Sequence, residues 1–261
     1  MPVDVHAPEV RRYLGAAPHL KHADLQALYR RLAAEVMALA APDGQRLRIL
    51  DLGAGEGSAT LAFLEAGAEV VAIDDDATRL EVLVERAASY PRSLEVRNGD
   101  ATALLAESAN EFDLVAAVSF LHHVPDYEAL LEEALAALRP GGVFFSFQDP
   151  LLHASLGSSS RWYARGAYLA WRASQGDLRN GAARYLRRRR SGFSMQLSED
   201  AEEFHAQRGG VDQQALLRVL ERHGVPARLV VYFSTQSPTF HRFGSALGLE
   251  NTFALIGGPV V

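Results

Sequence analysis

The chain has 261 residues, no cysteine and a formal net charge of −6. Without cysteine, disulfides, thiolate catalysis and cysteine-ligated metals are excluded, and the negative charge argues against sequence-independent binding of nucleic acid. No apolar run approaches the roughly 20 residues that cross a bilayer, and the polar N-terminus lacks the apolar core of a secretion signal. We therefore expect a soluble cytoplasmic protein without a membrane partner.

Residues 1–45 are predicted to be an N-terminal helical segment. Hydrophobic residues make up 48% of the chain, enough for one full core, so disorder is not expected. From Asp24 onward, apolar residues recur at the spacing of one helical face until Pro42 and Gly44 end the pattern. The face consists of Leu25, Leu28, Leu32, Val36 and Leu39.

A glycine-rich turn follows the first predicted strand. The apolar run 47–52 is typical of a buried strand, and Gly53, Gly55 and Gly57 come directly after it, before a helix that starts at Ser58. Glycine has no Cβ, so it lets backbone approach a ligand closely, and the start of the helix presents unpaired N–H groups. A nucleotide-like ligand binds at this edge of a parallel sheet.

Three consecutive acids end the second predicted strand, 69–73: Asp74, Asp75 and Asp76. Asp74 lies 17 residues after the third glycine, near the spacing at which an acidic side chain reaches a ribose hydroxyl. Asp76 fits the N-cap of a helix over 77–88. Solvated loops also carry acids, but the position of Asp74 favours a ribose contact.

Strands and helices continue to alternate, the pattern of a parallel sheet wrapped by helices. Further strands are expected at 94–97, 112–118 and 143–147, and Asp126 fits the N-cap of a helix over 127–138.

The alternation stops between residues 151 and 210 and resumes at Asp212, which fits the N-cap of a helix that ends at Gly224. Both tryptophans of the chain, Trp162 and Trp171, fall in the interrupted stretch. We interpret 151–210 as an inserted, mainly helical lid over the active site, because function tends to lie in such connections. An extra packing or dimerisation element is the alternative.

Four landmarks in order resemble the class I S-adenosylmethionine-dependent methyltransferases. The first reads D-x-G-x-G-x-G, which differs from the G-x-G-x-x-G of dinucleotide enzymes. The landmarks are Asp51–Gly57, Asn98–Ala101, Phe112–Asp126 and Leu138–Val143.

The resemblance implies a Rossmann-like α/β fold with a seven-stranded, mostly parallel sheet. Its last two strands, 228–233 and 252–256, are expected to form an antiparallel hairpin at the edge. The organisation predicted after the N-terminal segment is a cofactor-binding core at 46–150, the lid, and a C-terminal completion of the sheet at 211–261.

The resemblance also implies S-adenosyl-L-methionine as the cofactor and carries binding roles to matching positions. Asp75 departs from the usual apolar residue after the ribose acid, which puts its adenine contact in question. The implied contacts are Asp51, Gly53, Gly55 and Gly57 on the methionine and ribose side, Asp74 on the ribose hydroxyls, Asp75 beside the adenine, Asp100 with Ala101 at the adenine amine, and the backbone of Val118 and Ser119 at the ammonium group.

A general base is expected near the carboxyl ends of the fourth and fifth strands, where the acceptor has to meet the methyl group. His122 and His123 follow the fourth strand, and the ordinary histidine pKa of about 6.5 suits proton removal at neutral pH. Asp149 follows the fifth strand, and His205 lies near the end of the predicted lid. Paired histidines also serve only to shape this loop, and a strong nucleophile needs no base, so the base is left open.

Arginines and aromatic residues in the predicted lid indicate the chemistry of the substrate. Five arginines lie between Arg184 and Arg190. Such runs are usually solvated, but a guanidinium fork also binds a carboxylate or phosphate. Trp162 and Trp171, near Arg161, favour packing inside the lid and also suit a flat aromatic guest. An aromatic or anionic small molecule is therefore the expected substrate.

Together these observations favour a methyltransferase that acts on a small molecule, with oxygen as the preferred acceptor and specialised-metabolite tailoring as its role. No acid cluster or zinc pattern indicates a metal site. Three alternatives stay open: a nicotinamide oxidoreductase, a protein that binds S-adenosylmethionine for another purpose, and an RNA methyltransferase that grips RNA with the arginine run. A homodimer is one option for the assembly.

Overall fold

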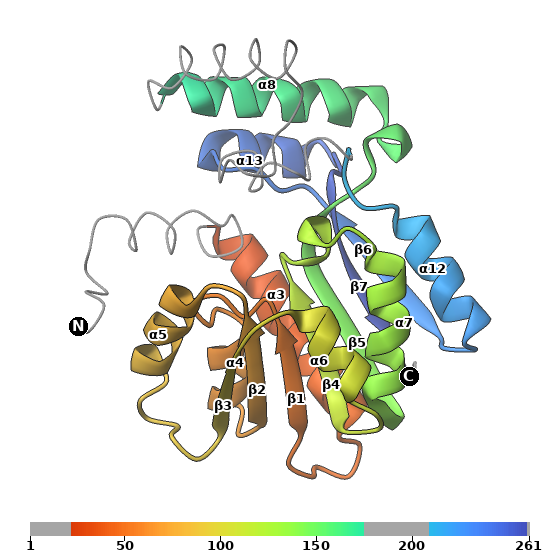
Figure 1. Ribbon diagram of the computed structural model, residues 1–261. Coiled ribbons are helices and arrows are strands. Elements are labelled where there is room, and N and C mark those ends of the chain that lie inside the picture. The colour runs from red at the N-terminus through yellow and green to blue at the C-terminus, as the bar shows by residue number, and fades with distance from the viewer. Residues whose placement is uncertain (1–21, 175–208, 260–261) are drawn as a thin grey trace, which may run out of the picture.

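The computed structural model describes residues 22–174 and 209–259 (Figure 1). The arginine run Arg184–Arg190 and His205, both singled out in the sequence, lie outside the described residues.

A seven-stranded sheet in the order β3-β2-β1-β4-β5-β7-β6 forms the centre of the fold. Strands β1 to β5 pair in parallel, and β7 runs antiparallel to both of its neighbours, β5 and β6. This confirms the predicted Rossmann-like sheet and its antiparallel edge. The strands are β1 (Arg48–Leu52), β2 (Glu69–Asp74), β3 (Leu94–Asn98), β4 (Phe112–Val118), β5 (Leu138–Pro150), β6 (Ala227–Tyr232) and β7 (Thr252–Gly257).

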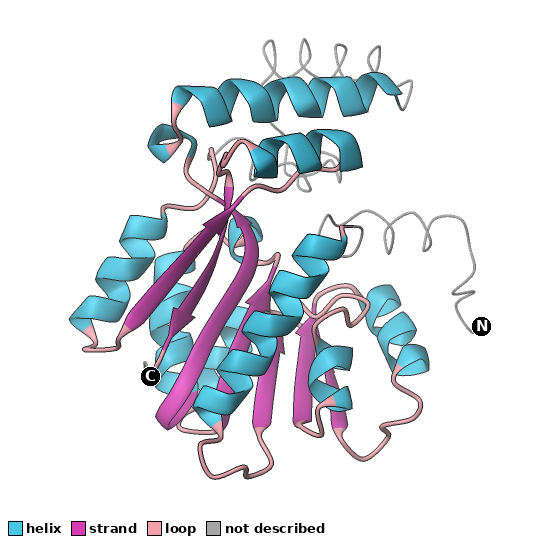
Figure 2. Cartoon of the chain, turned by 180° about the vertical axis from the view of Figure 1, so that it is seen from behind, coloured by secondary structure: helices cyan, strands magenta, loops and turns pink. Residues whose placement is uncertain are grey.

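Helices cover both faces of the sheet (Figure 2). Successive residues of β1, Ile49 and Leu50, lie in two separate hydrophobic clusters, one on each face, which explains why the inner strands are apolar throughout. Residues of α3, α4 and α5 pack in the first cluster, and residues of α6, α7 and α12 in the second. The helices of the body are α3 (Ala23–Ala40), α4 (Thr60–Glu65), α5 (Ala77–Arg86), α6 (Ala101–Glu107), α7 (Tyr127–Ala137) and α12 (Gln213–Arg222).

The predicted N-caps are confirmed. Asp76 accepts hydrogen bonds from two backbone N–H groups of α5, Asp212 accepts two from α12, and Asp126 accepts one from Ala129 in α7. One further cap was not predicted: the Asp100 carboxylate accepts a hydrogen bond from Thr102 N at 2.7 Å at the start of α6.

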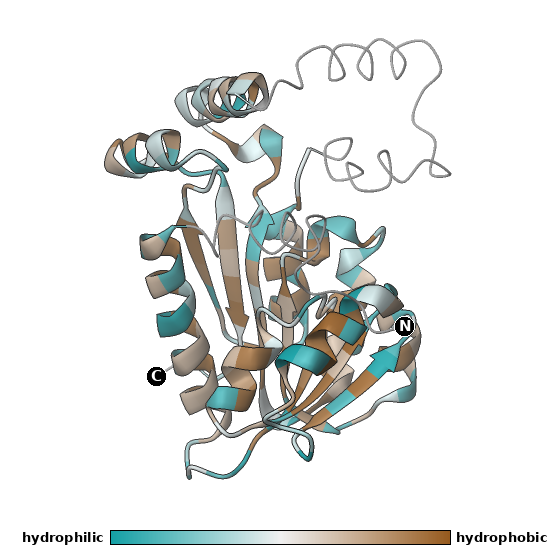
Figure 3. Ribbon diagram, turned by 90° about the vertical axis from the view of Figure 1, so that its left-hand side faces the viewer, coloured by the Kyte–Doolittle hydropathy of each residue, from teal (hydrophilic) through white to brown (hydrophobic). Residues whose placement is uncertain are grey.

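Two further helices lie beyond the carboxyl ends of the strands: α8 (Ser158–Ser174), which follows β5, and α13 (Pro238–Ala246), which follows β6. Figures 1 and 3 show them side by side above the sheet. The Tyr163 hydroxyl of α8 donates to the Phe240 carbonyl of α13 at 3.1 Å. The sequence predicted a simple hairpin between the last two strands and missed α13, which begins with proline at its first turn. Among the described residues, no helix is both long enough and apolar enough to cross a membrane.

Candidate active site

The glycine turn after β1 adopts left-handed backbone angles that favour glycine. The φ angles of Gly53, Gly55 and Gly57 are +64°, +52° and +84°. A Cβ on Gly53 would lie 2.2 Å from the Phe120 ring, and one on Gly57 would lie 2.3 Å from Leu83, so both are packed against side chains. At Gly55 the nearest atom within the described part of the chain is a carboxylate oxygen at 4.0 Å. Gly55 therefore faces the open part of the turn.

That carboxylate belongs to Asp74 at the end of β2, the predicted ribose acid. Its side chain is nearly buried, with 8% of the residue exposed. One oxygen accepts the backbone N–H of Gly55 at 2.8 Å, and the other accepts that of Asp76 at 3.0 Å. Each carboxylate oxygen has two lone pairs, so both keep acceptor capacity for a ligand. The open cradle at Gly55 and the fixed carboxylate next to it fit a nucleoside with a free ribose diol.

Asp51 in β1 is more deeply buried than Asp74 and points away from solvent. It is 1% exposed, and Thr60 Oγ1 donates to its carboxylate at 2.5 Å. The pKa of Asp51 is raised to about 7, chiefly by burial and also by the nearby charge of Asp74, while hydrogen bonds from Thr60 oppose the shift. A direct contact between Asp51 and a ligand stays a prediction, since its carboxylate is already bonded to α4.

The remaining predicted cofactor contacts line the same edge of the sheet with different exposure. Asp75 and Asp100 are exposed, Ala101 is half-buried at the start of α6, and Val118 is 8% exposed at the end of β4. Ser119 holds a φ angle of +55°, and its N–H donates to the Phe147 carbonyl of β5 at 2.7 Å. This left-handed residue lies where the resemblance places a backbone contact, and such strain often accompanies function.

Two of the predicted base candidates form a buried pair. His122 Nδ1 lies 2.7 Å from Asp149 Oδ1, and the His122 backbone N–H donates to the same oxygen at 3.2 Å. The Asp149 side chain is fully buried, and the His122 side chain is 10% exposed. The other candidate, His123, is exposed, with its ring centroid 4.1 Å from that of His122. The structure therefore brings His122 and Asp149 together at the ends of β4 and β5.

Burial disfavours charge on both partners of this pair. It raises the pKa of Asp149 to about 8. Hydrogen bonds from the backbone of His122 and Leu121 and the nearby charge of His123 lower this pKa, but less than burial raises it. Burial alone lowers the pKa of His122 to about 4. When Asp149 is ionised, its uncompensated charge opposes that second effect, because a proton on the imidazole neutralises it. The second oxygen of Asp149 has no hydrogen-bond partner among the described residues.

A β-bulge explains how Asp149 reaches His122, and sequence reasoning missed the residues that hold it. The pairing of β5 with β7 shifts register between Phe147 and Asp149. Gln148 between them has a φ angle of +70°, and its N–H donates to the Tyr232 hydroxyl of β6 at 3.0 Å. The Gln148 side chain donates to Ser234 at 2.6 Å. Residues 84 positions apart fix this bulge, so no local sequence signal announces it.

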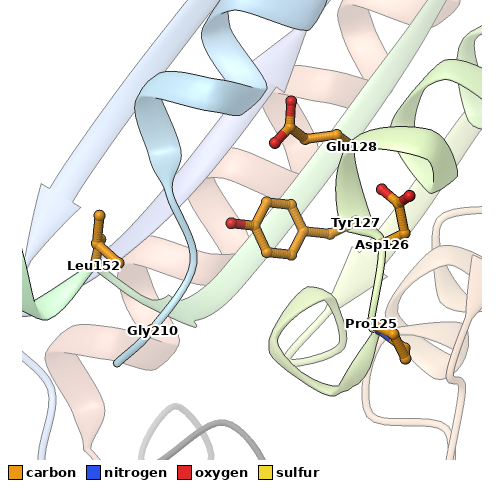
Figure 4. A pocket seen from close by; sticks show the side chains of 6 residues that line it. All are labelled: Pro125, Asp126, Tyr127, Glu128, Leu152 and Gly210. Carbon is orange, nitrogen blue, oxygen red and sulfur yellow. The ribbon is translucent and has the colours of Figure 1, made fainter. Parts of the chain in front are cut away.

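A separate hollow of about 260 Å³ opens beside the start of α7 (Figure 4). The Tyr127 hydroxyl at its wall accepts from Asp212 N at 3.1 Å. None of its lining residues is a predicted site residue, so it is distinct from the turn at Gly55. Its walls are Pro125, Asp126, Tyr127, Glu128, Leu152 and Gly210. Within residues 22–174 and 209–259, no group of three His, Asp or Glu side chains is placed to hold a metal ion.

Comparison with known proteins agrees with this geometry. Residues 50–146 match the family model described as "Methyltransferase domain". Over these residues the chain carries a class I S-adenosylmethionine-dependent methyltransferase domain. A ubiquinone biosynthesis O-methyltransferase from Chelativorans sp. is 35% identical over 106 residues, which cover 41% of this chain and 42% of that protein. The match thus spans less than half of the relative.

Two solved structures share the fold of the methyltransferase domain over most of the chain. A geranyl diphosphate C-methyltransferase from Streptomyces coelicolor, determined with Mg²⁺, geranyl diphosphate and S-adenosyl-L-homocysteine, has a TM-score of 0.56 and 13% identity. The similarity covers 99% of this chain and 86% of that one. An S-adenosylmethionine-dependent methyltransferase from Archaeoglobus fulgidus has a TM-score of 0.52 and 14% identity, with 90% and 94% covered.

We predict that the free energy of unfolding falls less with rising pH in Asp51→Asn than in the wild type. The folded-state pKa of Asp51, about 7, lies above the ordinary value of 3.8, so the folded protein binds more protons than the unfolded one between these values. Its contribution to stability is therefore largest at low pH and falls as the pH rises toward 7. Between pH 5 and pH 8 the contribution of Asp51 to the free energy of unfolding falls by about 3 kcal/mol.

Urea unfolding at both pH values measures the effect. Asparagine keeps an acceptor for Thr60 and carries no charge, so the variant's free energy of unfolding should change less between the two pH values than the wild type's. The matched control is Asp76→Asn, an exposed cap that asparagine also serves. An unchanged pH dependence in Asp51→Asn would contradict the assignment.

Proposed function

We propose that the protein is a methyltransferase that transfers the methyl group of S-adenosylmethionine to an oxygen atom of a small molecule. The observation that carries the proposal is the placement of two elements at one edge of the sheet: the cradle of Gly55 and Asp74, and the buried pair of His122 and Asp149. Phe120, which packs on Gly53, links the two elements in space.

The cradle supports the choice of cofactor. Asp74 would accept hydrogen bonds from the ribose hydroxyls, and Gly55 would let the backbone approach the methionine part without a side chain in between. When bound, S-adenosylmethionine supplies a methyl group on a positively charged sulfur. Three buried carboxyl groups, those of Asp51, Asp74 and Asp149, lie at this edge, and a bound cation would favour their ionised forms.

We predict that Asp74→Ala weakens S-adenosylmethionine binding at least tenfold. The variant loses charge-assisted hydrogen bonds worth about 1.5–3 kcal/mol. Isothermal titration calorimetry gives the affinity, and Asp76→Asn, two residues away, is the control that should bind as the wild type does. An affinity that does not change in Asp74→Ala would remove the ribose contact from the proposal.

The histidine–aspartate pair supports oxygen as the acceptor atom. A hydroxyl that is not ionised is a weak nucleophile and gains most from a base that takes its proton as it attacks. With Asp149 ionised, Nδ1–H of His122 donates to the carboxylate, and Nε2 carries the basic lone pair of the ring. A proton taken at Nε2 turns a buried net negative charge into a neutral ion pair. The pair is therefore a stronger base than burial of the imidazole alone would leave it.

We predict that His122→Asn lowers kcat by about 10²–10⁴-fold for a hydroxyl acceptor and leaves the affinity for S-adenosylmethionine within about twofold. Asp149→Asn keeps the shape of the contact and removes the charge, so it should lower kcat less. His223→Asn, an exposed histidine after α12, is the control. A loss in His123→Asn equal to that in His122→Asn would move the base to His123.

The acceptor can be identified with methyl-labelled S-adenosylmethionine and a panel of phenols, catechols and aromatic carboxylic acids, followed by a metabolite extract. We propose an aromatic or anionic small molecule and a role in tailoring specialised metabolites, with residues 151–210 as the substrate region. Labelled product from a phenol supports oxygen transfer. Tight cofactor binding without any labelled product would favour a protein that uses S-adenosylmethionine for another purpose.

A further inference from the structure

Five of the six large hydrophobic side chains that are exposed among the described residues gather on two neighbouring helices. Single exposed apolar residues need no explanation, but a cluster of them marks an interaction site. The sixth, Val84, lies in α5 and is 51% exposed. The five are Trp162 (71% exposed), Tyr168 (44%) and Leu169 (51%) in α8, Phe243 (62%) in α13, and Leu247 (66%) directly after α13.

The pattern within α8 shows that this exposure belongs to one face of the helix. Ser160 and Ala167 are buried against the rest of the molecule. Trp162 and Leu169 are seven residues apart and so lie along one line on the opposite side. The exposed Arg165 lies close to that line. The outer face of α8 therefore combines an indole, an aliphatic side chain and a guanidinium group.

The charge of the two helices is opposite to that of the chain. The protein carries 32 acidic residues and a net charge of −6, yet α8 and α13 together contain four arginines and no aspartate or glutamate. Arg161 and Arg165 of α8 and Arg242 of α13 are exposed. We call the exposed residues of these helices, with Leu247, the α8–α13 surface.

We propose that the α8–α13 surface binds an anionic phospholipid membrane peripherally. Tryptophan, phenylalanine and leucine side chains insert at the headgroup boundary, and exposed arginines on helices that contain no acidic residue attract anionic headgroups. A second copy of this chain fits the surface less well, because an isologous contact would bring the arginines of both copies together. Docking would leave the carboxyl edge of the sheet, which lies beneath these helices, close to the bilayer (Figure 1).

Co-sedimentation of the full chain with vesicles tests the proposal without cofactor or substrate, so it does not depend on the proposed reaction. We expect binding to vesicles of phosphatidylcholine mixed with phosphatidylglycerol to be about tenfold tighter than to phosphatidylcholine alone, and to weaken in salt. Arg161→Gln with Arg165→Gln should weaken it about 25-fold, at about fivefold per arginine. Trp162→Ala with Leu169→Ala should weaken it about tenfold.

The chain offers a matched control for each pair. Val84→Ala removes the exposed large hydrophobic side chain that, among the residues with a described placement, lies away from this surface, and Arg218→Gln removes an arginine of α12 whose side chain is 59% exposed. Both should bind vesicles as the wild type does. In Trp171→Phe, Trp162 is the only tryptophan, and its fluorescence should shift to the blue on anionic vesicles.

Three results would overturn the proposal. The first is equal binding to neutral and anionic vesicles, or none to either. The second is a loss in Val84→Ala or Arg218→Gln as large as that in the paired variants. The third is a concentration-dependent dimer that Trp162→Ala with Leu169→Ala abolishes, which would make the surface an interface between copies. Far-ultraviolet circular dichroism of each variant separates these results from unfolding.

Discussion

The site depends on carboxyl groups that are buried from solvent in strands at the centre of the sheet. Asp51, Asp74 and Asp149 end or lie in β1, β2 and β5, and none is more than 8% exposed. A buried carboxylate is unfavourable unless it is bonded or protonated. The fold supplies a different partner for each: a threonine hydroxyl, two backbone N–H groups and a histidine. The backbone N–H of Gly55 is one of these donors, and its hydrogen bond to Asp74 helps to hold the glycine turn in its left-handed conformation.

These partners leave the three acids with different tasks. Within the described part of the chain, only backbone N–H groups donate to the Asp74 carboxylate, so its spare acceptor capacity fits the proposed ribose contact. Asp51 is held by Thr60 of α4, and burial raises its pKa to about 7, so its main task is to anchor the end of β1 to that helix. Asp149 has one oxygen on His122 and one without a partner in the described residues, which makes it the acid most able to stabilise a new positive charge. A cationic cofactor and a transferred proton are what such an edge accommodates.

Much of this could be predicted from the sequence, because the features are local. The strands follow from apolar runs, the caps at Asp76, Asp126 and Asp212 from single residues before helical patterns, and Asp74 from its distance to the glycines. The pairing of His122 with Asp149 could not be predicted. It requires the register of β4 against β5 and a bulge that Tyr232 fixes from the far edge of the sheet. The capping role of Asp100 was hidden because its position also matched an adenine contact.

The α8–α13 surface is a second feature that could not be predicted from the sequence. A search for membrane contact in the sequence looks for a long apolar run, and this chain has none, so it predicted no membrane partner. Peripheral binding needs only a few apolar side chains among cations on one outer face, and burial decides which residues those are. Trp162 reads as lid core in the sequence and is 71% exposed in the fold. Both helices also lie outside residues 50–146, where the chain resembles its relatives. The match over residues 50–146 therefore supports the proposed cofactor edge, whereas the proposed membrane contact rests on α8 and α13, which lie outside that match.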